Sequence, residues 1–144
     1  MTELSQKKLW ELSSLLQNQD ITPCDIMADY IARINHLNPS LNAFAHLDLD
    51  TAQEQAKQAT KRWKTDQNLS PYDGIGFTAK DLIPAKNMPY RQGSQLCDAS
   101  LCDTDAPAVA RLKEAGMILL GKTTTCEFGH KGVTDSPLHG TSKN

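Results

Sequence analysis

A lysine ends a short run of small and apolar residues near the middle of the chain. Lys80 lies in the segment Gly-Ile-Gly-Phe-Thr-Ala-Lys-Asp (residues 74–81) and is the only Lys or Arg between Lys64 and Lys86. A lysine held away from water loses its proton more easily than an exposed one, and the neutral amine can act as a general base. The alternative is a lysine whose side chain reaches solvent from a strand end. The residues alone leave both interpretations open.

A second motif resembles a nucleotide-binding loop. Residues 116–123 spell G-x-x-x-x-G-K-T, the P-loop pattern. Its four middle residues are Met, Ile, Leu and Leu, and a helix rather than a strand is expected before Gly116. We therefore expect a helix end followed by a buried strand, and nucleotide binding through Gly116–Thr123 stays the less favoured alternative.

Composition excludes several classes of function. The four cysteines lie at irregular spacings without a Cys-x-x-Cys pair, so we expect free thiols rather than a zinc site. The 15 Lys and Arg residues against 17 Asp and Glu form no basic block, which argues against nucleic acid as a partner. Apolar runs are too short to cross a membrane, and the polar start lacks a signal-peptide core. We expect a cytoplasmic protein.

The elements that position Lys80 follow from hydrophobic periodicity. Leucines predict a helix over residues 3–18, and a second helix begins at Thr22-Pro23 and should end at Asn38-Pro39. Alternation predicts a strand over residues 41–47. A helix over residues 51–64 should bury a stripe of small residues and Trp63, namely Ala52, Ala56 and Ala59.

The second half of the chain continues the alternation of strand and helix. A strand over residues 75–80 precedes a long irregular stretch over residues 84–103, and long loops in compact domains are usually functional. A helix begins near Thr104 and ends at Gly116, and residues 117–120 are expected to form a buried strand. Residues 129–144 carry no helix or strand signal. This order predicts the α/β fold class.

An ordered set of short motifs resembles the N-terminal portion of the amidase signature family. The resemblance extends from about residue 22 to the last residue, and it also accounts for the P-loop-like Gly-Lys-Thr. It is carried by Gly74-Ile75-x-Phe77, Lys80-Asp81, Gly93-Ser94, Asp105-Ala106, Arg111-Leu112, Gly116, Gly121-Lys122-Thr123, Glu127-Phe128, Gly140 and Asn144.

The resemblance implies a fold, a division of the chain into layers, and a catalytic route by which protons pass between a lysine and two serines. The fold would be α/β/α around a mixed sheet, with residues 1–40 as a helical layer and residues 41–144 as the start of the sheet core of a single domain. Lys80 corresponds to the lysine that takes a proton through a bridging serine and so activates a nucleophilic serine. Gly93 and Ser94 match a pair with a pocket-shaping role, and Gly129 and His130 lie where relatives place substrate-facing residues.

One expected part of the family pattern is absent. No Gly-Gly-Ser-Ser-Gly-Gly occurs in the chain, so both catalytic serines are expected beyond Asn144. The resemblance then implies an amidase acting on the carbon–nitrogen bond of a small amide without metal or organic cofactor. The 144 residues would be inactive alone and prone to self-association through unpaired strand edges. Alternatives are the amide-hydrolysing A subunit of a tRNA-dependent amidotransferase, and a non-catalytic fragment or binding module.

Overall fold

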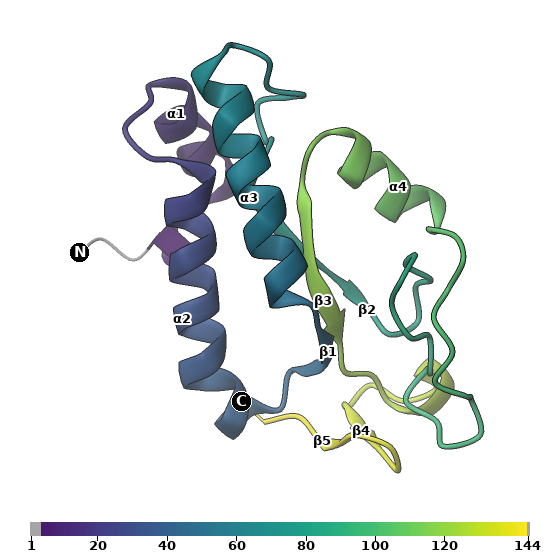
Figure 1. Ribbon diagram of the computed structural model, residues 1–144. Coiled ribbons are helices and arrows are strands. Elements are labelled where there is room, and N and C mark those ends of the chain that lie inside the picture. The colour runs from purple at the N-terminus through teal and green to yellow at the C-terminus, as the bar shows by residue number, and fades with distance from the viewer. Residues whose placement is uncertain (1–3, 144) are drawn as a thin grey trace. The chain divides into compact units, whose positions relative to one another are not determined.

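The computed structural model describes residues 4–143 and alternates helices with short strands (Figure 1). In chain order the elements are η1 (Leu4–Gln6), α1 (Leu9–Gln17), α2 (Pro23–Leu41), β1 (Phe44–Leu47), α3 (Leu49–Lys64), β2 (Gly76–Lys80), α4 (Pro107–Glu114), β3 (Ile118–Thr123), η2 (Glu127–Gly129), β4 (Asp135–Ser136) and β5 (Gly140–Thr141). Glu3 and Asn144, which belong to the predicted first helix and to the family motifs, lie outside the described residues.

The chain divides into two compact units. Unit 1 comprises Met1–His36, Asp48–Phe77 and Arg111–Leu120, and unit 2 comprises Leu37–Leu47, Thr78–Ala110 and Gly121–Asn144. Each unit is described by itself below. The residues that the family resemblance assigns to a functional site all belong to unit 2: Lys80, Gly93, Ser94, Gly129 and His130.

The core of unit 1 forms between α2 and α3, which lie side by side (Figure 1). The predicted small-residue stripe Ala52, Ala56 and Ala59 is fully buried. Met27 of α2 packs in one cluster with Ala52, Ala56 and two residues of β3, Ile118 and Leu120. Alanines on α3 let the two helices approach closely, because they add little side-chain volume at the contact.

The first predicted helix is divided in two. A 3₁₀ turn over Leu4–Gln6 precedes α1, which begins at Leu9. The carboxylate of Glu11 accepts a hydrogen bond from the backbone N–H of Lys8 at 2.8 Å, so this acidic side chain caps the helix start. The leucine periodicity extends across the break, which is why the sequence suggested a single helix.

The predicted end of α2 at Asn38-Pro39 is wrong, because the helix continues through Pro39 to Leu41. It ends where Asn42 adopts a positive φ of 51°. The side chain of Asn38 accepts hydrogen bonds from the N–H groups of Ala43 and Phe44 at 2.9 and 3.2 Å. These bonds fix the chain reversal after the last helical turn.

The main sheet has three strands in the order β1-β3-β2. β1 pairs antiparallel with β3, with His46 opposite Lys122 and an irregularity between Phe44 and His46. In unit 1 the N–H of Ile118 donates to the carbonyl of Ile75, and in unit 2 the N–H of Asp81 donates to the carbonyl of Thr123, both at 3.0 Å. The pairs advance in the same direction along both strands, so β2 runs parallel to β3 and the sheet is mixed.

Two predictions about strands need correction. The strand predicted over residues 41–47 is limited to Phe44–Leu47, because residues 41–43 complete and leave the last turn of α2. The C-terminal segment was expected to have no regular structure, yet it forms the hairpin β4–β5. Pro137 begins its turn and Gly140, with φ of 72°, ends it. Strands of two residues are too short to show periodicity.

Between β2 and α4 the chain is irregular, as predicted. The stretch over residues 84–103 contains only isolated bridges, which join Lys86 to Cys102 and Pro89 to Leu101. α4 then begins at Pro107, and Gly116 follows its end with φ of 84°. The irregular stretch belongs to unit 2, where it contributes to the cluster described next.

Candidate functional site

Lys80 is the last residue of β2, and its side chain is exposed. Its ammonium donates a hydrogen bond to the backbone carbonyl of Thr124 at 3.2 Å. Thr124 itself is buried, and its hydroxyl bonds to Ser142 Oγ and to the carbonyl of Ala43. The ammonium is therefore held at a fixed point beside the end of β3, with solvent access retained.

Asp81, the next residue, has a buried carboxylate that accepts hydrogen bonds from several groups of unit 2. Oδ1 accepts hydrogen bonds from Lys122 Nζ at 3.3 Å and from the N–H of Arg91 at 3.2 Å. Oδ2 accepts a hydrogen bond from the N–H of Gly93 at 3.2 Å. Charge and two backbone donors together keep this carboxylate stable away from water.

Lys122 is the buried lysine of this region, with no exposed side-chain surface. Besides Asp81, its ammonium lies 3.4 Å from the carbonyl oxygen of Pro89 and 5.5 Å from the ring centre of Tyr90. The ring face adds a cation–π contact to the ion pair. These partners occupy the ammonium, so Lys122 is part of the support of the site and has no open face for a substrate.

The structure also shows which conformation the segment with the P-loop pattern adopts. Gly116 forms the turn after α4, and residues 118–123 form β3 with Ile118 to Lys122 buried. A phosphate-binding loop needs its backbone N–H groups and its lysine to face a ligand. Here the segment is a strand and the lysine binds Asp81, so the geometry supports the buried-strand interpretation.

Gly93 and Ser94 lie in the irregular stretch and are both buried. Gly93 has φ of 67°, and a Cβ there would lie 2.7 Å from the carbonyl oxygen of Thr125. Ser94 Oγ donates to Glu127 Oε1 at 2.7 Å and accepts from the N–H of Leu96 at 3.1 Å. Both residues join the irregular stretch to the segment after β3, and their pocket-shaping role stays a prediction.

Gly129 and His130 follow β3 and lie in the turn that contains η2. Gly129 has φ of 71°, and a Cβ there would lie 2.6 Å from Leu82 Cδ1. His130 is exposed, and its Nδ1 contacts the carbonyl oxygen of Glu127. The preceding Phe128 also has a positive φ of 51° and is half exposed. The tight turn fixes the backbone of this segment, and the substrate-facing role of its side chains stays a prediction.

His139 is a member of the cluster that the sequence did not reveal. Its Nε2 lies 3.8 Å from Asp81 Oδ2 and is buried without a hydrogen-bond partner within residues 4–143. Burial lowers the pKa of His139; the charge of Asp81 opposes this effect and the charge of Arg91 adds to it. The imidazole therefore favours its neutral form.

Sequence reasoning proposed Lys80 as a site residue but gave no role to the buried group beside it. Asp81, Lys122 and His139 had no assigned role, although one signal was available. A lysine that directly follows the buried run of residues 118–121 needs a carboxylate partner. The pairing joins residues 41 positions apart, so it becomes specific only once β2 and β3 are known to be neighbours.

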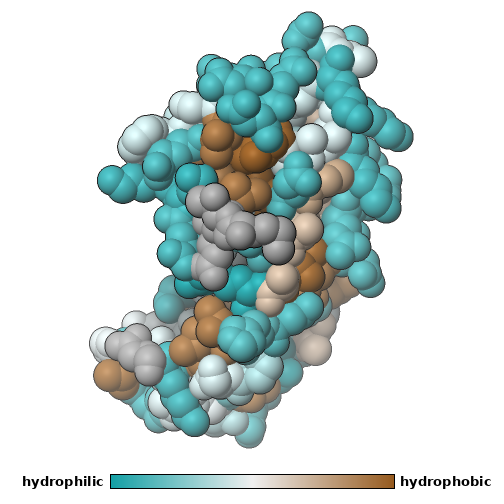
Figure 2. Space-filling model, turned by 90° about the vertical axis from the view of Figure 1, so that its left-hand side faces the viewer, coloured by the Kyte–Doolittle hydropathy of each residue, from teal (hydrophilic) through white to brown (hydrophobic). Residues whose placement is uncertain are grey.

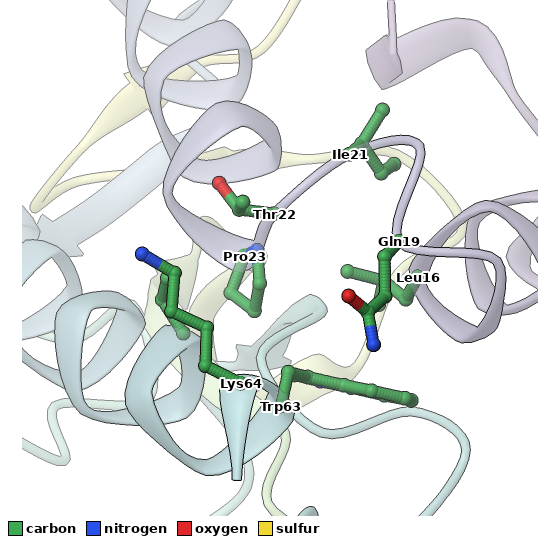
Figure 3. Close-up of a pocket in the computed structure, with 8 residues that line it drawn as sticks. Leu16, Gln19, Ile21, Thr22, Pro23, Trp63 and Lys64 are labelled. Carbon is green, nitrogen blue, oxygen red and sulfur yellow. The ribbon is translucent and has the colours of Figure 1, made fainter. Parts of the chain in front are cut away.

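Other possible sites within the described part of the chain are weaker. Residues 4–143 contain no group of three or more His, Cys, Asp and Glu side chains that could hold a metal ion. Across the same residues, no helix has the length and apolarity needed to cross a membrane. Unit 1 contains a pocket of about 140 Å³ between the ends of α1 and α3 and the start of α2, where Leu16, Pro23 and Trp63 present mainly apolar surface (Figure 3). No residue predicted for the site lines it.

Comparison with known proteins places this geometry in a family. A family model described as Amidase matches residues 25–144. The chain is 31% identical to an acylamidase from Rhodococcus erythropolis over 134 residues, which cover 93% of this chain and 28% of that protein. It is 29% identical to the A subunit of the glutamyl-tRNA(Gln) amidotransferase of Thermobifida fusca, covering 100% of this chain and 29% of that protein.

Solved structures agree with the sequence relatives. The crystal structure of an amidase superimposes with a TM-score of 0.88 at 32% identity, covering 96% of this chain and 31% of that one. A peptide amidase from Stenotrophomonas maltophilia gives a TM-score of 0.86 at 25% identity, covering 96% and 30%. The predicted α/β fold class with a mixed sheet is confirmed. The chain spans less than a third of the length of these relatives.

Proposed function

Because the chain belongs to the amidase signature family, we propose that it supplies the general base of an enzyme that hydrolyses the carbon–nitrogen bond of a small amide. The observation that carries this proposal is the family match over residues 25–144, which includes the Lys80-Asp81 motif. The ammonium of Lys80 is exposed at the end of β2 and donates to the carbonyl of Thr124 at 3.2 Å, so the expectation of a lysine held away from water does not hold for residues 4–143. The role of Lys80 as the base therefore rests on the family motif.

The proposed reaction follows the relay that the family resemblance implies. The neutral amine of Lys80 accepts a proton from a bridging serine, which accepts one from a nucleophilic serine, and the nucleophile attacks the amide carbonyl carbon. The relay returns the proton to the leaving nitrogen as the carbon–nitrogen bond breaks. Water then hydrolyses the acyl-enzyme. Both serines would belong to sequence beyond Asn144, in the part of the relatives that this chain does not cover.

The domain plan is part of the same proposal. Residues 1–144 would form the N-terminal part of one domain, with residues 1–40 as a helical layer and residues 41–144 as the start of its mixed-sheet core. Gly93 and Ser94 would shape the pocket, because they link the irregular stretch to the segment after β3. Gly129 and His130 would face the substrate from that segment.

Two substitutions of Lys80 test the proposed base in the complete protein that contains this sequence. Lys80→Ala should lower kcat for a simple amide by about 10²–10⁴-fold, the usual contribution of a positioned acid or base. Lys80→Arg keeps the positive charge but cannot give up its proton, so it should be equally impaired. Release of the amine product provides the measurement. Full activity of Lys80→Ala would show that the lysine is structural.

A second candidate function is the A subunit of a tRNA-dependent amidotransferase. It is favoured by the match along the whole chain to the Thermobifida fusca protein. The two candidates differ in their need for partners: a free-standing amidase should hydrolyse a small amide as a purified single polypeptide. An amidotransferase component should depend on a second polypeptide encoded beside it, so purification with and without that neighbour distinguishes them.

A further inference from the structure

We propose that Asp81 is a positioning residue for Lys80, and that it acts through its buried ion pair with Lys122. This inference rests on the proposed function, because it assumes that Lys80 is the base. Asp81 follows Lys80 directly in the chain, and their side chains have opposite surroundings. Asp81 is 1% exposed, whereas Lys80 is exposed. One residue therefore anchors the strand end while its neighbour presents an amine.

Two hydrogen bonds join the ends of β2 and β3, one from the backbone of Asp81 and one from the side chain of Lys80. The N–H of Asp81 donates to the carbonyl of Thr123 at 3.0 Å, and Nζ of Lys80 donates to the carbonyl of Thr124 at 3.2 Å. Adjacent residues at the end of β2 thus bind adjacent residues at the end of β3. A shift of Asp81 along the strand would carry the Lys80 backbone with it and would change the position of the amine.

The carboxylate of Asp81 forms three bonds to two other parts of unit 2. It binds the ammonium of Lys122 in β3 and the N–H groups of Arg91 and Gly93 in the irregular stretch. Both of its oxygens are used, so an amide, with a single carbonyl oxygen, cannot replace all three bonds. The geometry predicts that Asp81→Asn loosens the strand end even where the protein stays folded.

The fold needs the negative charge of the Asp81 carboxylate as well as its two oxygen acceptors, because the charge balances the buried ammonium of Lys122. Lys122 is fully buried, and its remaining partners are the carbonyl of Pro89 and the ring of Tyr90. Removing the charge of Asp81 leaves a buried ammonium without a counter-charge, which is more harmful than removing both charges together. Asp81→Asn with Lys122→Met should therefore fold better than Asp81→Asn alone.

The chain contains a matched control. Asp73 is also fully buried and forms an ion pair, with Arg62 NH2 2.6 Å from Asp73 Oδ1. This pair lies within unit 1, whereas Lys80 and Asp81 belong to unit 2. Asp73→Asn thus disturbs a buried carboxylate of the same type without touching the proposed base.

The test measures kcat and KM of the complete protein at a temperature where circular dichroism shows each variant to be folded. A displacement of about 1 Å in a catalytic group can reduce the rate about 10²-fold. Asp81→Asn should therefore lower kcat about 100-fold and change KM by less than about threefold, since the base acts in the chemical step. Asp73→Asn should keep kcat within about threefold of the wild type. If Asp81→Asn does not fold, the double variant with Lys122→Met takes its place and should lose at least about tenfold in kcat.

Each outcome bears on one of the two proposals. Wild-type kcat in Asp81→Asn or in the double variant, with Lys80→Ala inactive, overturns the positioning role and leaves the proposed function standing. Equal losses in Asp81→Asn and Asp73→Asn overturn it too, because general damage then explains both. Wild-type activity in Lys80→Ala overturns the proposed function, and the inference with it.

Discussion

The ammonium of Lys122 lies 3.3 Å from Oδ1 of Asp81, with 0% and 2% of the two side chains exposed. Transfer of both charges out of water is costly, and the pair persists because Asp81 also accepts two backbone hydrogen bonds. The pair links the end of β2 to β3 within unit 2. Its contribution to stability can be separated from any catalytic role.

The stability of the folded chain should suffer most when only one partner of this ion pair is replaced, and less when both are replaced by neutral residues. In the 144-residue chain, Asp81→Asn and Lys122→Met should each lower the free energy of unfolding by about 3–5 kcal/mol, because each leaves a buried group unpaired. The double variant should lose clearly less than the sum of the two, as expected for contacting residues. Urea unfolding followed by circular dichroism gives these values.

An exposed ion pair supplies the control for that cycle. Lys57 and Glu54 lie 3.2 Å apart on α3, with more than half of each side chain exposed. Lys57→Met should change the unfolding free energy by less than about 0.5 kcal/mol. Additive losses for Asp81 and Lys122 would show that the two side chains do not stabilise one another.

Gly93 should resist substitution because both its backbone conformation and its surroundings favour glycine. Its φ is 67°, and an added Cβ would lie 2.7 Å from the carbonyl oxygen of Thr125. Gly93→Ala should destabilise the chain by about 1–3 kcal/mol, the usual cost of a strained backbone position. Gly132 has no atom within 4 Å of an added Cβ, so Gly132→Ala should be nearly neutral. Thermal unfolding of the two variants compares them, and equal midpoints would contradict the expected strain.

The hydrophobic pattern of the sequence correctly predicted those helices and strands whose buried residues recur every few positions. The alanine stripe located α3, and the apolar run over residues 117–120 located β3, because each pattern is set by the face that the element buries. The irregular stretch over residues 84–103 was predicted from its Pro and Gly content. Lys80 is a candidate base only through the family motifs, because the periodicity around it left two interpretations open.

The remaining features leave no hydrophobic pattern in a short window of the sequence. The end of α2 past Pro39 is fixed by hydrogen bonds that the Asn38 side chain accepts from the N–H groups of residues 43 and 44, and these form only once the chain has reversed. The hairpin β4–β5 is too short for a pattern. The groups around Asp81 come from β3, the irregular stretch and the β4–β5 turn, so no window of the sequence contains them together.

His139 should make the chain less stable as the pH falls. Burial lowers its pKa from the ordinary value of 6.5, so the folded chain binds a proton at this site less readily than the unfolded chain. The contribution of neutral His139 to stability is therefore complete above pH 6.5 and is lost as the pH falls through the lowered pKa. Urea unfolding at a series of pH values between about 7.5 and 5 measures this loss.

Replacing His139 distinguishes its contribution to the pH dependence of stability from the contributions of other titrating groups. His139→Gln should reduce the loss of stability over that pH range, because the protonating group is removed. The charged groups that act on the imidazole are Asp81 and Arg91, whereas Asn42 and Ser136 form hydrogen bonds with the backbone of His139. His36 is exposed on α2, so His36→Gln serves as the control and should keep the wild-type slope. An unchanged slope in His139→Gln would contradict the prediction.

The 144-residue chain should self-associate and should not hydrolyse amides. Exposed large hydrophobic side chains include Leu96 at 86%, Val133 at 65% and Trp10 at 61%, and Figure 2 shows hydrophobic surface among hydrophilic side chains on one face. Exposed apolar surface and sheet edges favour association between copies. Sedimentation velocity over a range of concentrations should show a rising average mass.

Leu96→Lys should weaken association, whereas Ala99→Lys, which adds the same charge at a small exposed residue, should weaken it less. A monomer at all concentrations, or clear hydrolysis of a simple amide by these residues alone, would contradict the prediction.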